Sequence, residues 1–362
     1  MGERNRSANF VTKRRRARRF DASQRRSVSS LRAESDRRTL PRARRGGSPV
    51  SAPAPGGPAT AVDPRKRAVR LGIRWVLAIV GGLVIVFALG ILVRRIPAVE
   101  AFIADWSGFV PLPAGAPLGI PAWLSWQHFL NSLFLLLIVR TAFQIKSRKR
   151  PPAFWTRDND GPIRTKRPPR RLSIHVWFHL SLDALWVLNG IVFAVLLFAT
   201  GQWMRIVPTD WSVIPHALSA FLQYASLQWP TEDPWLSYNA LQLLSYFGVV
   251  FILAPLAVLT GLRLSSVWPQ EGRWNRWFSE SLFRKVHVLV LWGFLVFVVL
   301  HVGLVLLNGP LANLSAMYAA QEDAPWLGVG LFVLSLAALA GAWLLASPDR
   351  LKKVAARFGK VR

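Results

Sequence analysis

Long apolar stretches alternate with short polar or basic segments along most of this 362-residue chain. Six of the stretches hold about 20 or more residues, enough for a helix rising about 1.5 Å per residue to cross a hydrocarbon core of about 30 Å. The pattern therefore predicts an all-α integral membrane protein with six transmembrane helices. Their predicted bounds are residues 71–93, 124–145, 174–200, 237–262, 284–307 and 326–346.

Residues 1–69 are rich in Arg, Ser, Pro, Ala and Gly and lack apolar periodicity, which predicts a disordered basic tail. The Lys13–Arg19 tract could bind nucleic acid or anionic lipid. Because no aromatic residue interrupts it, we prefer a solvated tail and expect no specific nucleic acid. Arg18-Arg19-Phe20 resembles a twin-arginine export signal, but the first apolar stretch begins about fifty residues later, so we do not interpret it as one.

The distribution of charge predicts the orientation in the membrane. Short loops rich in Lys and Arg remain cytoplasmic. Every second connection is basic, and 42 of the 46 Lys and Arg residues fall in four segments: 1–74, 146–171, 263–285 and 347–362. We therefore expect a multi-pass protein of a bacterial cell (plasma) membrane with both termini cytoplasmic. Arg94 and Arg95, at the outer end of the first helix, are a local exception.

The chain contains no cysteine, which excludes disulfides, iron–sulfur ligation, thiolate metal sites and covalent haem attachment. Any redox cofactor must therefore use other ligands, and the six histidines are the candidates. His287 and His301 lie on the predicted fifth helix, about 21 Å apart along its axis and about 40° apart around it. One helix face thus presents an imidazole near each membrane surface, as two stacked haems require.

Each haem iron needs a second axial ligand at the same depth. His128 lies near the outer start of the second helix, level with His301, and His179 lies near the inner start of the third, level with His287. We therefore predict an outer haem iron bound by His128 and His301 and an inner one bound by His179 and His287. Such saturated iron transfers single electrons rather than binding oxygen.

Several other side chains are candidates for a place near the haems. His175, one turn from His179 on the same face, competes with it as ligand, although a position at the interface or beside a propionate is the preferred interpretation. His216 lies in an outer connection and is not expected to be a ligand. Asp183 is a candidate acceptor for an imidazole N–H. Four basic residues could pair with propionates or simply extend to the membrane surface: Arg140, Arg205, Arg284 and Lys285.

Residues 120–310 resemble the di-haem membrane cytochromes of the cytochrome b561 and hydrogenase or formate dehydrogenase b-subunit group. The resemblance rests on Gln127–Asn131, Ile138–Ile145, His179–Gly190, Gly201–Arg205, Lys285–His287 and Leu300–Val302. Ala142 departs from the family pattern, in which glycine is frequent at this place. An extra helix at 70–95, another at 324–347 and a basic tail at 348–362 also lie outside it.

The resemblance implies that helices two to five form a four-helix bundle around two non-covalent haem b groups. It assigns the four iron ligands to the same histidines, His128, His179, His287 and His301. Small residues would make room for the macrocycles or simply pack, and the candidates are Gly190, Gly248, Gly293 and Gly303.

The function implied is a lipid-embedded membrane subunit of an oxidoreductase complex in a respiratory chain. It would carry electrons between quinone or quinol and a partner at the outer face, such as a molybdenum oxidoreductase. One alternative is a stand-alone oxidoreductase acting on superoxide or ferric ion. Another is a haem-free permease, which would instead gather polar residues at mid-membrane.

Overall fold

The computed structural model describes residues 64–147, 149–159, 168–230, 233–269 and 272–362. Six helices there are long and apolar enough to cross a membrane, which confirms the predicted all-α membrane fold. Their bounds are Arg67–Arg94, Ala122–Lys146, Ile174–Ala199, Ala240–Leu264, Glu280–Leu307 and Pro325–Leu345. Residues 1–63, with the Lys13–Arg19 tract and Arg18-Arg19-Phe20, lie outside the described residues.

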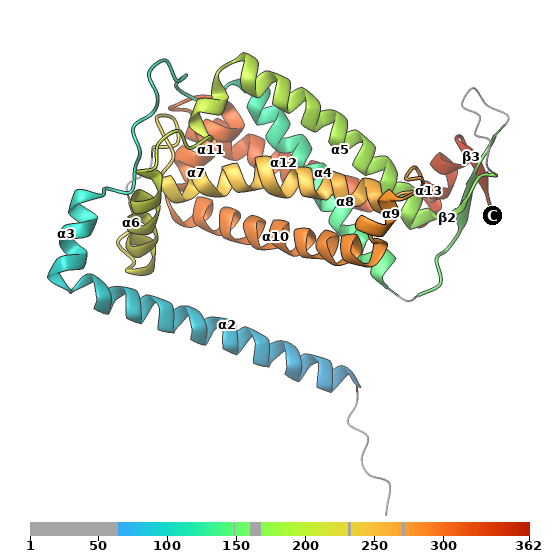
Figure 1. The fold of residues 1–362 in the computed structure, drawn as a ribbon, viewed down its shortest axis with the longest axis horizontal. Helices are drawn as coiled ribbons and strands as arrows, with labels where there is room; N and C mark the ends of the chain where they lie inside the picture. The colour runs from blue at the N-terminus through green and yellow to red at the C-terminus, as the bar shows by residue number, and fades with distance from the viewer. Residues whose placement is uncertain (1–63, 148, 160–167, 231–232, 270–271) are drawn as a thin grey trace, which may run out of the picture. The chain divides into compact units, whose positions relative to one another are not determined.

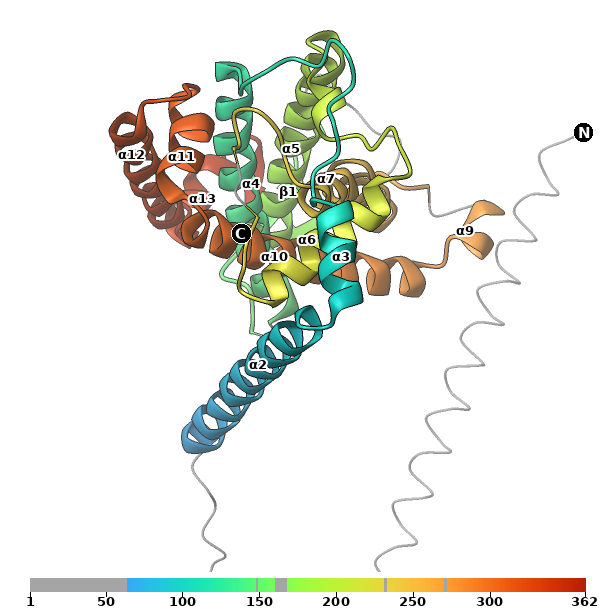
Figure 2. The same ribbon diagram turned by 90° about the vertical axis from the view of Figure 1, so that its left-hand side faces the viewer.

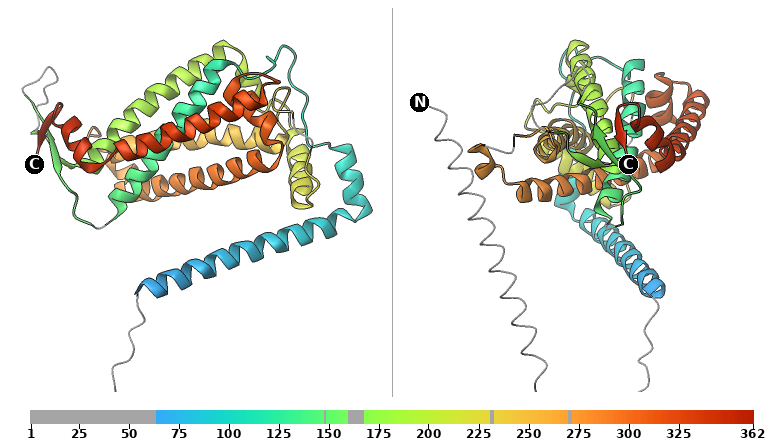
Figure 3. Two further views of the ribbon diagram at one scale, coloured as in Figure 1. Left: turned by 180° about the vertical axis from the view of Figure 1, so that it is seen from behind. Right: turned by 90° about the vertical axis from the view of Figure 1, so that its right-hand side faces the viewer.

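Four of the spans run side by side (Figures 1 and 2). Helix α4 (Ala122–Lys146) packs against α5 (Ile174–Ala199), and α10 (Glu280–Leu307) packs against α8 (Ala254–Leu264). Helix α12 (Pro325–Leu345) packs against the outside of α4 (Figure 3). The second to fifth spans therefore form the predicted bundle, and the sixth covers one side of it.

Serine side chains set the start of two bundle helices. The Ser173 hydroxyl accepts a hydrogen bond from the Val176 amide at the start of α5, and the Ser279 hydroxyl accepts one from Leu282 at the start of α10. Each serine satisfies a backbone donor that has no partner within the helix.

The fourth span is a composite of α7 (Ala240–Phe247), a π-helix η2 (Gly248–Leu253) and α8. The π-helix ends beside Pro255, which has no amide hydrogen for a regular helical bond. The Ala254 amide instead donates to the more distant carbonyl of Val249. This local widening sets the rotation of α8 relative to α7.

A polar contact joins α4 and α5 inside the bundle. The Asn131 side-chain oxygen accepts hydrogen bonds from Trp186 Nε1 at 3.1 Å and from Asn189 Nδ2 at 3.4 Å. Asn189 is buried, so the contact satisfies a polar group that lipid could not.

The remaining helices lie around the bundle. Helix α2 (Pro64–Arg94) exposes most of its large apolar side chains, and its Gly90 lies against Ala225 of α6 so closely that a Cβ would come within 2.3 Å of the Ala225 oxygen. The shorter elements are α3 (Pro97–Asp105), η1 (Gln202–Arg205), α6 (Val213–Ala225), α9 (Trp274–Trp277), α11 (Pro310–Leu314) and the π-helix η3 (Ser315–Ala319).

A small sheet was not predicted. Its strands β1 (Phe154–Arg157), β2 (Arg171–Ser173) and β3 (Gly359–Val361) form an antiparallel sheet in the order β2-β1-β3. With α13 (Pro348–Ala355) it lies at the opposite end of the bundle from α6 (Figure 1). Residues 348–362, which the sequence suggested to be a tail, are thus folded. Strands of three or four residues are too short to leave a clear alternating pattern.

Candidate metal centres

The outer predicted pair lies between α4 and α10. The ring centres of His128 and His301 are 6.3 Å apart, and the ring planes make an angle of 58°. Aromatic side chains surround the pair. Phe297 stacks on His301 at 5.3 Å, Tyr246 approaches the edge of His301 at 5.9 Å, and Tyr318 approaches His128 at 5.8 Å.

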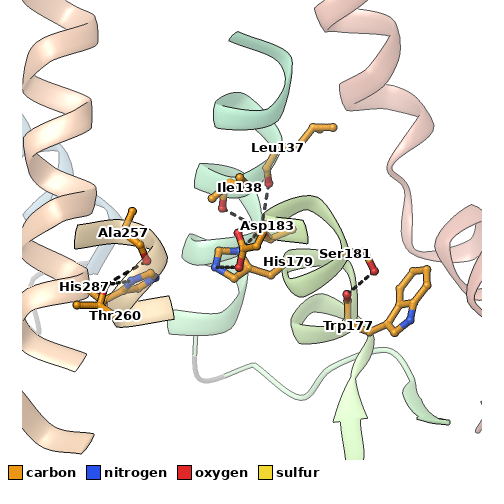
Figure 4. A network of polar contacts seen from close by, with 10 residues as sticks. Leu137, Ile138, Trp177, His179, Ser181, Asp183, Ala257, Thr260 and His287 are labelled. Carbon is orange, nitrogen blue, oxygen red and sulfur yellow. Dashed lines mark hydrogen bonds and ion pairs between the residues drawn. The ribbon is translucent and has the colours of Figure 1, made fainter. Parts of the chain in front are cut away.

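The inner predicted pair lies between α5 and α10. The ring centres of His179 and His287 are 6.5 Å apart, and the planes make an angle of 81°. Each Nδ1 nitrogen meets a threonine hydroxyl from a neighbouring helix. Thr141 Oγ1 of α4 lies 2.7 Å from His179 Nδ1, and Thr260 Oγ1 of α8 lies 2.8 Å from His287 Nδ1 (Figure 4).

These separations suit two imidazoles that share one metal. A metal lies about 2 Å from an imidazole nitrogen and the ring centre about 1.1 Å further, so two rings on opposite sides of one metal have centres about 6.3 Å apart. The two pairs, at 6.3 and 6.5 Å, both match this value.

The donor set also fits haem better than a bare ion. Among the described residues, no group of three or more His, Cys, Asp or Glu side chains could hold a metal. Two histidines alone leave a bare metal ion under-coordinated, whereas iron in a porphyrin needs only two axial ligands. In addition, His128 Nδ1 is buried without a hydrogen-bond partner, so no hydrogen bond at this atom competes with metal binding by the His128 ring.

The four predicted glycines differ in their surroundings. A Cβ added at Gly293 would lie 3.2 Å from the Leu253 side chain, so this glycine permits close packing of two helices. A Cβ at any of the others would meet no atom within 4 Å: Gly190, Gly248 and Gly303. Gly190 lies about 20° around α5 from His179, so open space borders the helix face that carries this histidine.

The structure brings His179, and not His175, against His287. Within the described residues no ring contact joins His175 to another histidine, and its Nδ1 is buried without a partner. Asp183 Oδ2 lies 3.7 Å from His179 Nε2, beyond hydrogen-bond distance, and the hydroxyl of Thr141 is the group that meets His179 Nδ1.

The four basic candidates have other partners or lie at the surface. Arg140 donates to the Trp343 carbonyl and its guanidinium lies over the Trp343 ring. Arg284 forms an exposed ion pair with Glu280. Within the described residues, no contact joins Lys285 to either histidine pair. The pairing of these basic residues with haem propionates stays a prediction.

Arg205 is almost fully buried and joins three connecting segments. It donates to the carbonyls of Gly119 at 2.6 Å, Pro234 at 2.9 Å and Trp235 at 3.1 Å. Gly119 has a φ of +75°, and a Cβ there would lie 2.5 Å from the Trp235 ring, so the close approach requires glycine. Both terminal nitrogens of Arg205 are therefore engaged by backbone carbonyls, which gives this side chain a structural role.

His216 lies apart from the two histidine pairs and has a structural position. Its Nδ1 accepts a hydrogen bond from the Gly108 amide at 3.2 Å, and its ring meets Trp106 edge to face. Burial holds the pKa of His216 below its ordinary value, against the opposing effect of Asp210. A neutral ring is what the Gly108 contact requires.

Sequence reasoning missed Thr141 and Thr260. Depth along the helices could have indicated them. Thr141 lies five residues before the end of α4 and Thr260 four before the end of α8, while His179 and His287 lie close to the starts of the adjacent antiparallel helices. Hydroxyl groups at this level in apolar helices were therefore the natural partners for the inner histidines.

A family model described as prokaryotic cytochrome b561 matches residues 119–319, more than half of the chain and all four histidines of the two pairs. Comparison with curated proteins found no match, and neither did comparison with solved structures. The matched segment begins just before α4 and ends with η3, so it includes the whole bundle. The chain therefore belongs to the prokaryotic cytochrome b561 family and is a multi-pass bacterial membrane cytochrome b that works in electron transfer.

Proposed function

We propose that this protein binds two haem b groups, one between His128 and His301 and one between His179 and His287, and conducts electrons across the membrane between the quinone pool and a partner oxidoreductase. The observation that carries the proposal is the pairing of these histidines at 6.3 and 6.5 Å. When bound, haem supplies one-electron redox chemistry.

The protein's own contribution is to hold the two pairs at different depths. Helix α10 is continuous from Glu280 to Leu307 and carries one histidine of each pair, about 21 Å apart along its axis. Each partner comes from a different helix, α4 or α5. Residues 120–310 would thus carry the function, and the helices at 70–95 and 324–347 would be additions to this core.

Orientation follows from charge. The ends of α4 and α10 that carry the outer pair adjoin connections poor in Lys and Arg, and the inner pair adjoins basic ones. We infer that both termini are cytoplasmic and that the redox partner docks at the outer face. The family supports a quinone or redox partner in general, and a molybdenum oxidoreductase is one such partner.

The histidine pairs argue against a haem-free permease. A permease would gather polar groups near mid-membrane, where discontinuous helices leave backbone for the substrate. Here the polar link at mid-bundle is a closed contact of Asn131 with Trp186 and Asn189. The imidazoles instead form separate pairs toward the two ends of α10.

The test is the haem content and visible spectrum of the purified protein, oxidised and then reduced with dithionite. We expect b-type bands and about two haems per chain. Absence of these bands would refute the proposal, and one haem per chain would refute the four-ligand assignment. Purification from native membranes then separates the conduit, which should carry an oxidoreductase with it, from a stand-alone enzyme that reduces superoxide or ferric ion unaided.

A further inference from the structure

We propose that Thr141 and Thr260 are positioning residues that hold both inner histidines in one tautomer, with hydrogen on Nδ1 and a free lone pair on Nε2, and thereby tune the inner haem alone. The proposal rests on the function proposed above. Its basis is a contact that occurs twice, once at each ring of one histidine pair.

The two threonines have the same local geometry. Thr141 Oγ1 lies 3.0 Å from the Leu137 carbonyl oxygen and 2.8 Å from that of Ile138. Thr260 Oγ1 lies 2.5 Å from the Leu256 oxygen and 3.2 Å from that of Ala257. A carbonyl can only accept, so each hydroxyl donates its one hydrogen to the backbone of its own helix.

The direction of the histidine contact follows from this. A hydroxyl that has donated its hydrogen can only accept, so Nδ1 of His179 and of His287 must donate to it. A neutral imidazole carries one hydrogen, which leaves Nε2 with the lone pair that binds a metal. The side chains of Thr141 and Thr260 thus prepare both rings for coordination before any metal arrives.

The opposite arrangement is less favourable. If each hydroxyl donated to Nδ1, each Nε2 would carry a hydrogen that needs an acceptor. The nearest carboxylate oxygen to His179 Nε2, on Asp183, lies at 3.7 Å, and among the described residues no hydrogen bond from His287 Nε2 is present. A donor without a partner inside an apolar bundle is unfavourable.

The outer pair has no such support on its α4 side. His128 Nδ1 is buried and has no hydrogen-bond partner. An imidazole whose N–H is hydrogen-bonded is a more basic metal ligand, which stabilises the ferric state and lowers the reduction potential. The two haems should therefore respond differently to changes at Thr141 and Thr260.

The experiment compares Thr141→Val, Thr260→Val and the double variant with the parent and with Thr141→Ser and Thr260→Ser. Valine keeps the shape of threonine and removes the hydroxyl, whereas serine keeps the hydroxyl. Thr200→Val is the matched control, because Thr200 also donates to a carbonyl one turn back, at 2.7 Å on Leu196, and meets no histidine. Potentiometric titration and ¹⁵N NMR of histidine-labelled protein are the measurements.

We expect one of the two potentiometric steps to move to higher potential in each Val variant, further in the double variant, with inner-haem affinity falling about 10- to 100-fold. The other step should stay in place, and serine should restore the parent values. Unchanged steps in haem-loaded Val variants would overturn the inference while leaving the proposed function intact.

The NMR measurement reports the tautomer even if the protein carries no haem. A protein without haem would refute the proposed function but would still allow this test. In haem-free protein, His179 and His287 should carry hydrogen on Nδ1 in the parent, and this preference should weaken in the Val variants. Hydrogen on Nε2 of both rings would overturn the inference. If a Val variant fails to fold, the same spectrum of the parent and of the Ser variants decides.

Discussion

His287 and His301 lie on the same unbroken helix, and each faces a histidine from a different helix: His179 of α5 and His128 of α4. One helix therefore contributes to both candidate metal centres, while α4 and α5 each contribute to one. This asymmetry makes the consequences of single substitutions distinct.

Replacing His128 or His301 with alanine should remove the outer haem, and the remaining haem should stay at the inner pair. We expect the haem content to fall from about two to about one per chain, because one imidazole cannot replace the second axial ligand. His216→Ala is the control, since this histidine lies against Trp106 and Gly108, and it should retain both haems. If the His301→Ala protein folds but loses both haems, the two haem sites are not independent and this prediction is wrong.

His175 and His179 can be separated in the same way. His179→Ala should lose the inner haem, whereas His175→Ala should keep it, because only His179 lies against His287. Haem content and the potentiometric titration measure the difference. The reverse result would assign the inner ligand to His175.

Asn131→Leu should destabilise the bundle without touching either histidine pair. The substitution leaves Trp186 Nε1 and Asn189 Nδ2 without an acceptor, and each unsatisfied donor costs about 1–3 kcal/mol. Thermal unfolding in detergent should show a lower midpoint. Ser245→Ala, which removes an exposed bond to the backbone of its own helix, should leave the midpoint almost unchanged.

Arg205→Lys should loosen the connecting segments that Arg205 joins. Lysine cannot present the planar fork that lets arginine reach the carbonyls of Gly119, Pro234 and Trp235 together. We expect a loss of about 2 kcal/mol or more in stability and faster proteolysis near these carbonyls. Arg284→Lys alters an exposed ion pair and should change stability by less than about 0.5 kcal/mol.

Acidification should loosen the contact between His216 and Gly108. Because the folded pKa of His216 lies below its ordinary value of 6.5, the folded state favours the neutral ring. The stabilising contribution is complete above about pH 6.5 and is lost as the pH falls through the lowered pKa. Hydrogen exchange at the Gly108 amide should therefore quicken in acid. His216→Phe keeps an aromatic ring against Trp106 and should abolish this pH dependence.

The transmembrane helices and the histidine pairs could be predicted because both depend on local geometry. Apolar length marks a span, and a rise of 1.5 Å with a turn of 100° per residue places His287 and His301 on one face. Charge then sets the direction of each helix, which is enough to match His128 and His179 to them by depth.

The contacts that support these histidines could not be predicted in the same way. The position of Thr260 depends on the π-helix before Pro255, which changes the rotation of the helix by an amount that no periodic pattern records. The buried fork of Arg205 depends on the shapes of two loops. The β1 and β3 strands pair across about two hundred residues, and they are too short to be recognised singly.

The position of α10 late in the chain has a consequence for biosynthesis. His128 and His179 enter the membrane early, but the histidines that complete their pairs lie on the fifth of six spans. A nascent chain still shorter than about residue 301 holds no complete outer pair. Under the proposed assignment, both haem sites can be complete only after residue 301 has been synthesised, and a product truncated before residue 287 would contain neither histidine pair.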